Sequence, residues 1–323
     1  MQSLGTKLIA FWDRYERSLS FGALALGFTF DLWIAKRPDS VPDNILLLSY
    51  LFIAGAIIVL VNVQKTRAQE RAHPFEPLLL ILILQFCFGG LAGNLLILYG
   101  KSGTVGGSAL FLGLLLALLL GNEFLKSRYA QLRLTVAIYY FLLLTYCIIA
   151  VPTFLFHTIG AKVFLISGGV SLLAAGVFLF VLYSVVFRGD KSASRRRQTY
   201  EMAAVILCVL AVFNGLYFLN IIPPVPLSLK AVGVYHSITT DDKGGYTGIY
   251  EPPAWFVFWR DTAATYTIVS GQSAYCFSAV FAPGDLATSI VHRWEYFYPT
   301  TGHWITVARI GFPITGGRAE GYR

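Results

Sequence analysis

Charged residues are scarce in this chain of 323 residues: they make up 13% of it, whereas an ordinary soluble domain holds about 25%. Hydrophobic residues make up 56%, and the mean hydropathy is +0.64. So few charges cannot cover the surface of a water-soluble protein of this length. The composition therefore excludes a wholly soluble protein and indicates that most of the chain lies in lipid.

Cysteine is also scarce, with four residues in the whole chain. Cys87, Cys147 and Cys208 lie within long apolar runs, and only Cys276 lies outside them. A single thiol cannot close a disulfide within its own domain. The C-terminal part of the chain is therefore expected to be held together by packing alone.

Basic residues exceed acidic ones by eight, but this excess is missing from the C-terminal part of the chain. Residues 224 to 323 carry seven basic and seven acidic side chains, so that region is electrically balanced. The excess belongs to the apolar part, where basic residues orient helices and attract anionic lipid headgroups. Nucleic-acid binding thus loses its main support.

Long apolar runs account for most of the first 222 residues. At a rise of 1.5 Å per helical residue, seven of these runs are long enough to approach or cross a hydrocarbon layer of about 30 Å. Each is expected to be a helix, because no water is present in that layer to form hydrogen bonds with the backbone. The predicted spans are 19–35, 45–63, 77–99, 108–125, 134–156, 163–187 and 202–222. Residues 1–18 repeat apolar positions at helical spacing, which predicts an amphipathic helix that anchors the chain to the headgroups or docks a partner.

Lysine and arginine alternate in number from one connection to the next. The N-terminal arm and the second, fourth and sixth connections hold fourteen of them, while the odd-numbered connections hold four. By the positive-inside rule the N-terminus is cytoplasmic, and seven crossings place the C-terminal region on the opposite side.

Glycines recur within two of the predicted spans, at Gly89, Gly90 and Gly93 and again at Gly168, Gly169 and Gly176. Small residues at such spacing let helix backbones approach one another closely. We expect both groups to lie at helix contacts.

A proline-rich linker at 223–228 ends the last predicted span, because proline cannot continue helical hydrogen bonding. After the linker the sequence consists of short runs rich in valine, threonine and aromatic residues, separated by turn residues. WFVFW at 255–259 and TYTIVS at 265–270 are two of these runs, and TTDDKGGYTG at 239–248 is a turn-rich stretch between predicted strands. Such a pattern predicts an antiparallel β-sandwich of immunoglobulin-like type over residues 229–323.

The stretch HRWEYFYPTTGHW at 292–304 predicts a β-hairpin with a tight turn at 299–302. His292 and Trp294 share one face of its first strand. His292 and His303 could approach each other across the hairpin, but Glu295, the nearest third candidate ligand, points away from His292 in a regular strand, so we predict no metal site. Cys276 lies mid-strand and no serine sits in a nucleophile elbow, so the sequence predicts neither an enzyme nor a cofactor.

The end of the sequence resembles an uncharacterised bacterial membrane-protein family catalogued as domain of unknown function 2914. The matching features are H-x-W at His292 and Trp294 and the run G-G-R-x-x-G-Y-R, which includes Arg318 and Tyr322. The resemblance implies a bacterial inner-membrane protein with a periplasmic C-terminal domain, and no activity. Members of that family continue past this run, so we expect a sandwich that lacks its last strands, or an open sheet edge at which oligomers form.

The sequence therefore predicts a membrane-anchored protein of the cell envelope that binds or assembles, with the lipid bilayer and an envelope protein or a glycan as partners. His292, Trp294, Arg318 and Tyr322 are the candidate ligand or partner contacts. The alternative is a small-molecule transporter or channel, which is weakened because no carboxylate lies in the middle of a predicted span.

Overall fold

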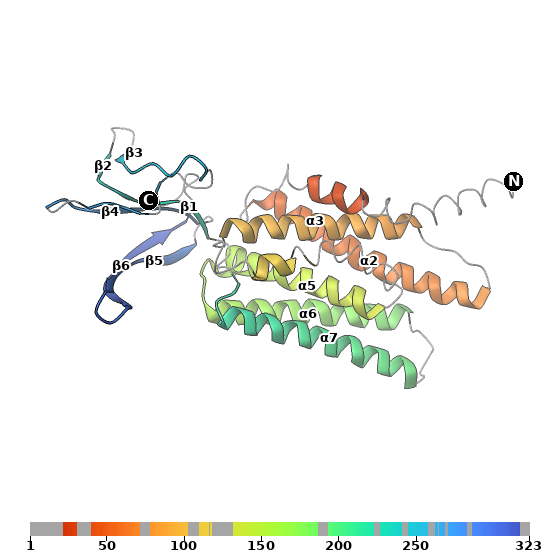
Figure 1. The fold of residues 1–323 in the computed structure, drawn as a ribbon. Helices are drawn as coiled ribbons and strands as arrows, with labels where there is room; N and C mark the ends of the chain where they lie inside the picture. The colour runs from red at the N-terminus through yellow and green to blue at the C-terminus, as the bar shows by residue number, and fades with distance from the viewer. Residues whose placement is uncertain are drawn as a thin grey trace. The chain divides into compact units, whose positions relative to one another are not determined.

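The computed structural model describes residues 22–30, 40–71, 78–102, 110–115, 117, 132–186, 193–222, 227–240, 245–257, 262–263, 265–268, 271–282 and 286–316. The chain divides into two compact units, residues 1–226 and residues 227–323. The first is helical and the second contains the strands (Figure 1).

Five helices in the described ranges are long and apolar enough to cross a membrane. Their apolar cores lie where five of the seven spans are predicted. The helices are α2 (Val41–Arg71), α3 (Leu78–Ser102), α5 (Leu132–Val151, continued by a π-helix, η2, at Pro152–Phe156), α6 (Ala161–Val186) and α7 (Ala193–Phe218).

The two other predicted spans fall largely outside the described residues. Of the span 19–35, residues 22–30 are described and are helical; of the span 108–125, only 110–115 and 117 are described, and these are helical too. The amphipathic helix predicted at 1–18 lies outside the described residues.

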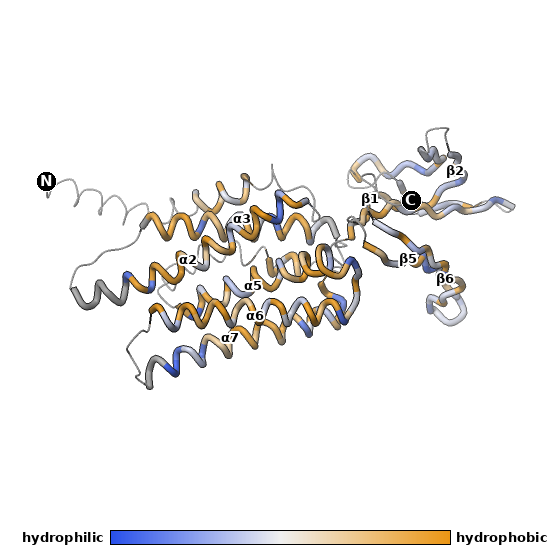
Figure 2. Tube along the Cα trace, turned by 180° about the vertical axis from the view of Figure 1, so that it is seen from behind, coloured by the Kyte–Doolittle hydropathy of each residue, from blue (hydrophilic) through white to orange (hydrophobic). Residues whose placement is uncertain are grey.

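One end of the helical unit gathers basic residues. Helix α2 ends there, and α5 and α7 begin there (Figure 1). Arg133 at the start of α5 forms an ion pair with Glu201 of α7, Nη1 to Oε2, at 3.0 Å, and Arg197 pairs with the same carboxylate at 3.0 Å. Hydrophilic segments lie at both ends of the bundle, whereas the helices are largely hydrophobic between them (Figure 2).

Close backbone packing occurs between helix 22–30 and α3. A Cβ added at Gly27 would collide with the carbonyl oxygen of Phe86, and one added at Gly89 would collide with that of Leu24. The prediction for the first glycine group is therefore confirmed at Gly89 and also at Gly93, where an added Cβ would meet the ring of Phe28.

The second glycine group behaves differently. Gly168 lies close to α7, because a Cβ added there would come within 3.3 Å of Leu210, a tight contact; nothing lies within 4 Å of a Cβ added at Gly169 or Gly176. The prediction of a close helix contact is therefore confirmed at Gly168 and wrong for Gly169 and Gly176.

The described strands pair as three antiparallel sheets of two strands each. Strand β1 (Ser228–Tyr235) pairs with β4 (Tyr275–Phe281), β2 (Ser237–Thr240) with β3 (Tyr246–Ile249), and β5 (Ala287–Tyr298) with β6 (His303–Thr315). The predicted antiparallel, strand-rich character of the region is confirmed.

Three details of the strand prediction are wrong. Residues 246–248, predicted to be part of a turn-rich stretch, belong to β3 (Tyr246–Ile249), and the turn that joins β3 to β2 is shorter than predicted. The described parts of WFVFW and TYTIVS are not strands; Val257 N–H instead donates to Ala254 O at 2.8 Å, which closes a turn. Pro252 and Pro253 precede this turn and remove two backbone donors that a strand would need.

Candidate functional site

The predicted hairpin is present and its register is defined. Trp304 pairs with Phe297 and His303 pairs with Tyr298, so the loop consists of residues 299–302. Gly302 has φ of 68°, a left-handed conformation that glycine adopts without strain, and its N–H donates to Tyr298 O at 2.9 Å. The turn prediction is confirmed, including the need for glycine.

The two faces of the hairpin differ in chemistry. Alternation puts Ile290, Trp294 and Tyr296 on one face, and their partners Phe312, Ala308 and Ile305 share it. We call this the apolar hairpin face; it also includes His292, Tyr298, His303 and Ile310. The opposite face carries Arg293, Glu295 and Arg309, with Arg293 Nε 3.1 Å from Glu295 Oε1, and it also carries the exposed apolar side chains of Val291, Phe297 and Trp304.

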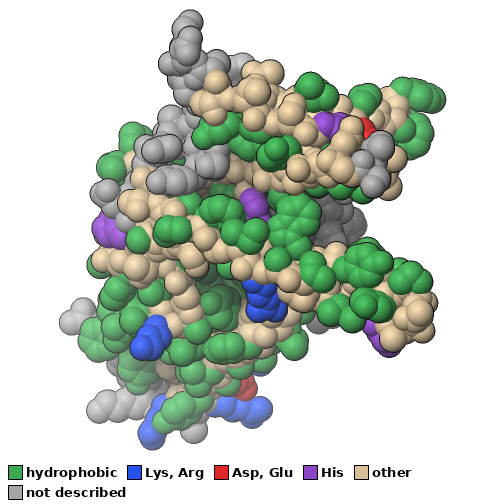
Figure 3. Space-filling model, turned by 90° about the vertical axis from the view of Figure 1, so that its left-hand side faces the viewer, with side chains coloured by type: hydrophobic (Ala, Val, Ile, Leu, Met, Phe, Trp, Pro, Cys, Tyr) green, Lys and Arg blue, Asp and Glu red, His purple; other side chains and the backbone are tan. Residues whose placement is uncertain are grey.

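Side chains on the apolar hairpin face are uncovered over much of its length. Tyr296 is 53% exposed, and Ile305 and Ile310 are each 46% exposed. Hydrophobic side chains are visible on the projecting arm of strands in Figure 3. A run of exposed aromatic and aliphatic side chains is typical of an interaction surface, because removing apolar surface from water lowers the free energy.

His292 is half-buried and bonded within its own unit. Its Nε2 lies 2.8 Å from Ser278 Oγ of β4, and its ring lies 4.9 Å from that of Phe312. This contact joins β5 to β4, which belong to different sheets. The imidazole thus has a structural partner at the base of the apolar hairpin face.

The structure brings two of the four predicted site residues together. His292 and Trp294 lie on the same face of β5, two residues apart, and both are half-buried. The other two predicted site residues, Arg318 and Tyr322, lie outside the described residues.

The two histidines of the hairpin do not approach each other. His292 pairs with Ile310 and His303 pairs with Tyr298, so their positions lie six residues apart along β5. In the described ranges no group of three or more potential ligands converges on a metal position.

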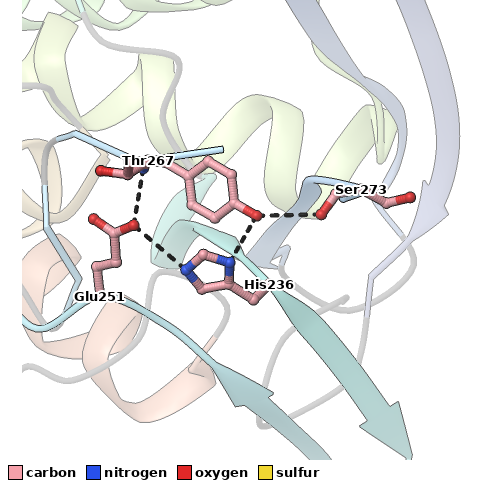
Figure 4. A network of polar contacts seen from close by, with 5 residues as sticks. His236, Glu251, Thr267 and Ser273 are labelled. Carbon is pink, nitrogen blue, oxygen red and sulfur yellow. Dashed lines mark hydrogen bonds and ion pairs between the residues drawn. The ribbon is translucent and has the colours of Figure 1, made fainter. Parts of the chain in front are cut away.

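The strand unit also contains a polar network that the sequence did not reveal. His236 lies between β1 and β2, and Figure 4 shows it beside Glu251. His236 Nδ1 is 3.0 Å from Tyr266 Oη, and His236 Nε2 is 3.4 Å from Glu251 Oε1. Tyr266 Oη donates to Ser273 O at 3.2 Å, and Thr267 N–H donates to Glu251 Oε1 at 2.8 Å.

The network connects four parts of the chain. Glu251 follows β3, whereas Tyr266, Thr267 and Ser273 belong to the long segment before β4. Fifteen residues separate Glu251 from His236, and thirty separate Tyr266 from it. No periodic pattern links them, so nothing in the sequence indicates that they meet.

Two buried hydrogen bonds join helices of the unit: Tyr99 Oη of α3 donates to Thr145 O of α5 at 3.1 Å, and Tyr140 Oη of α5 lies 3.2 Å from Ser171 Oγ of α6. Asn214 donates to Leu210 O of its own helix at 2.8 Å, and the buried amide of Asn94 has no hydrogen-bond partner among the described residues.

Comparison with known protein families, with curated proteins and with solved structures finds no match for this chain. The resemblance of the C-terminal motifs therefore stays a prediction.

Proposed function

We propose that the protein is a membrane-anchored binding or assembly protein of the bacterial cell envelope, and that its strand unit works on the outer side of the cytoplasmic membrane. The observation that carries this proposal is the apolar hairpin face, on which large side chains such as Tyr296, Ile305 and Phe312 are 43–53% exposed. A surface of this kind supports binding more than catalysis.

The finer architecture belongs to the same proposal. Seven helices would cross the membrane, with the N-terminus in the cytoplasm, and the gathering of Arg133 and Arg197 at one end of the bundle is compatible with that orientation. The sheets β1–β4 and β5–β6 would be layers of a β-sandwich, which the bond between Ser278 and His292 supports.

The described sheet edges suggest how a partner would bind. In the described ranges β6 pairs only with β5, so its outer edge presents backbone donors and acceptors over thirteen residues. An extended segment of an envelope protein, or of a second copy, would add a strand there and lay its side chains over the apolar face. A glycan would instead stack its sugar rings on Tyr296 and Tyr298.

A photo-crosslinking amino acid tests this proposal in intact cells. Placed at Ile305, on the apolar hairpin face, it is expected to give one product of defined mass; placed at Arg309, on the opposite face, it serves as the matched control. A Tyr296→Ser substitution should reduce the Ile305 product at least about fivefold, since it removes a large contact. Equal amounts of crosslinked product at both positions would contradict binding by this face. The same holds if no product forms at Ile305 and the protein is not retained on cell-wall glycan.

A further inference from the structure

The network at His236 contains more acceptors than a neutral imidazole can satisfy. Ser273 O accepts only, so the hydroxyl proton of Tyr266 is used in the bond to that carbonyl at 3.2 Å. Tyr266 Oη must then accept at its other contact, and the donor there must be His236 Nδ1–H, at 3.0 Å.

The other ring nitrogen has the same requirement. Nε2 of His236 lies 3.4 Å from Glu251 Oε1, and a carboxylate oxygen only accepts. A proton on Nε2 makes this contact favourable, whereas a lone pair there would face a negative charge. All three contacts are satisfied together only when His236 carries a proton on both nitrogens.

The neutral side chain must give up one contact. Its proton stays on Nε2, facing Glu251, and Nδ1 becomes an acceptor. The hydroxyl of Tyr266 then donates to Nδ1 and can no longer donate to Ser273 O. Loss of one proton from His236 to water thus releases the bond that closes the segment from Tyr266 to Ser273.

We propose that His236, Tyr266 and Ser273 form a proton-operated latch. Uptake of a proton at Nδ1 turns the hydroxyl of Tyr266 toward Ser273 O and closes the hydrogen bond between these two residues. No covalent bond forms or breaks, and the proton comes from water, which reaches the ring because the His236 side chain is 30% exposed.

The titratable groups that face the imidazole are few among the described residues. Among the described residues, Glu251 is the charged group in contact with the ring, and Tyr266 is the titratable hydroxyl. Strand β4 brings Tyr275 opposite Tyr235 and Cys276 opposite Val234, next to His236 in the chain. Burial raises the pKa of the Cys276 thiol, so it stays neutral and adds no charge there.

The latch rests on contacts within the strand unit and does not depend on the proposed function. Proteolysis of the full-length protein in detergent tests it, with a protease active from pH 5.5 to 8.0 and mass spectrometry to follow cleavage between Tyr266 and Ser273. Ile268, which is 57% exposed, provides a site. Between pH 5.5 and pH 8.0 the cleavage rate of the wild type should rise about fivefold more than that of Tyr266→Phe, because only the wild type loses a hydrogen bond over this change of pH.

Two further variants make the result decisive. Tyr250→Phe removes a neighbouring hydroxyl and keeps the ring that contacts Tyr235, so it should behave as the wild type. His236→Gln, whose amide does not titrate in this range, should lose the extra pH dependence as Tyr266→Phe does. Equal pH dependence of cleavage in the wild type and in Tyr266→Phe overturns the latch. Loss of the pH dependence in Tyr250→Phe overturns it as well. Tyr266→Phe decides the question even if His236→Gln fails to fold.

Discussion

His292 of β5 and Ser278 of β4 are joined by a hydrogen bond of 2.8 Å, which links the β5–β6 sheet to the β1–β4 sheet. Both side chains are half-buried, so water replaces the bond poorly when one partner is removed. The contact fixes the base of the apolar hairpin face and thereby its direction.

Replacing Ser278 by alanine should therefore destabilise the strand unit by about 1 kcal/mol, the usual net value of such a bond. Thermal unfolding of the purified protein, followed by a signal from the strand unit, measures this loss. Ser289→Ala is the matched control, because Ser289 is exposed on the opposite face of β5 and should change stability by less than about 0.5 kcal/mol. Equal effects of both substitutions would show that the bond contributes nothing.

The contact of helix 22–30 with α3 makes a second prediction. Gly89→Ala puts a methyl group against the carbonyl of Leu24, which belongs to a backbone that cannot turn aside, so overpacking should cost about 1–3 kcal/mol. The measurement is the loss of thermal stability in detergent. Gly176→Ala introduces the same methyl group where nothing lies within 4 Å, and it should be neutral or slightly stabilising.

Hydrophobicity predicted the positions of the five membrane-length helices, because both the length and the composition of a run are set by the hydrocarbon layer. It predicted their ends poorly. Helix α7 begins at Ala193, nine residues before the predicted start, and α2 continues to Arg71, eight residues past the predicted end. Arginine and lysine form helices well but are not hydrophobic. Hydropathy therefore marks only the part of each helix that lies in lipid and misses its polar ends.

Local signals also explain which strands could be predicted. The hairpin at 287–315 combines alternating side chains with a turn that demands glycine at Gly302, and both signals lie close together in sequence. Strand β3 carries Thr247 and Gly248 and follows a stretch of turn residues, so nothing local marks it as a strand. The His236 network depends on partners in irregular segments, whose positions only the folded chain defines.

Cys276 gives a prediction about pH. Burial raises the pKa of its thiol, so the reactive thiolate forms at a higher pH than in an exposed cysteine. Alkylation of Cys276 at pH 7.5 should be slower than alkylation of a cysteine placed at the exposed position 272, studied as Gln272→Cys with Cys276→Ala. Rates are followed by mass spectrometry, and a faster reaction at Cys276 would show that the thiol is not shielded.

The same raised pKa has a consequence for stability. The unfolded chain loses the thiol proton near the ordinary value of about 8.5, while the folded chain retains it. This contribution is therefore fully present below that pH and decreases as the pH rises toward the folded value. Cys276→Ala should remove this part of the alkaline loss of stability, which parallel unfolding curves at pH 7 and pH 9 would show.

The ends of the helices provide the test of orientation. Arg71, at the end of α2, belongs to the basic end of the bundle, whereas Ser102, at the end of α3, belongs to the other end (Figure 1). With the N-terminus in the cytoplasm, Ser102→Cys should react with a membrane-impermeant maleimide added to intact cells, and Arg71→Cys should react only after permeabilisation. Both variants are made in a Cys276→Ala background, because Cys276 would itself face outward. The opposite labelling pattern would put the strand unit in the cytoplasm, where it could meet neither an envelope glycan nor a periplasmic protein. The proposed function would then fail, whereas the latch at His236 would stand, because it depends only on contacts within the strand unit.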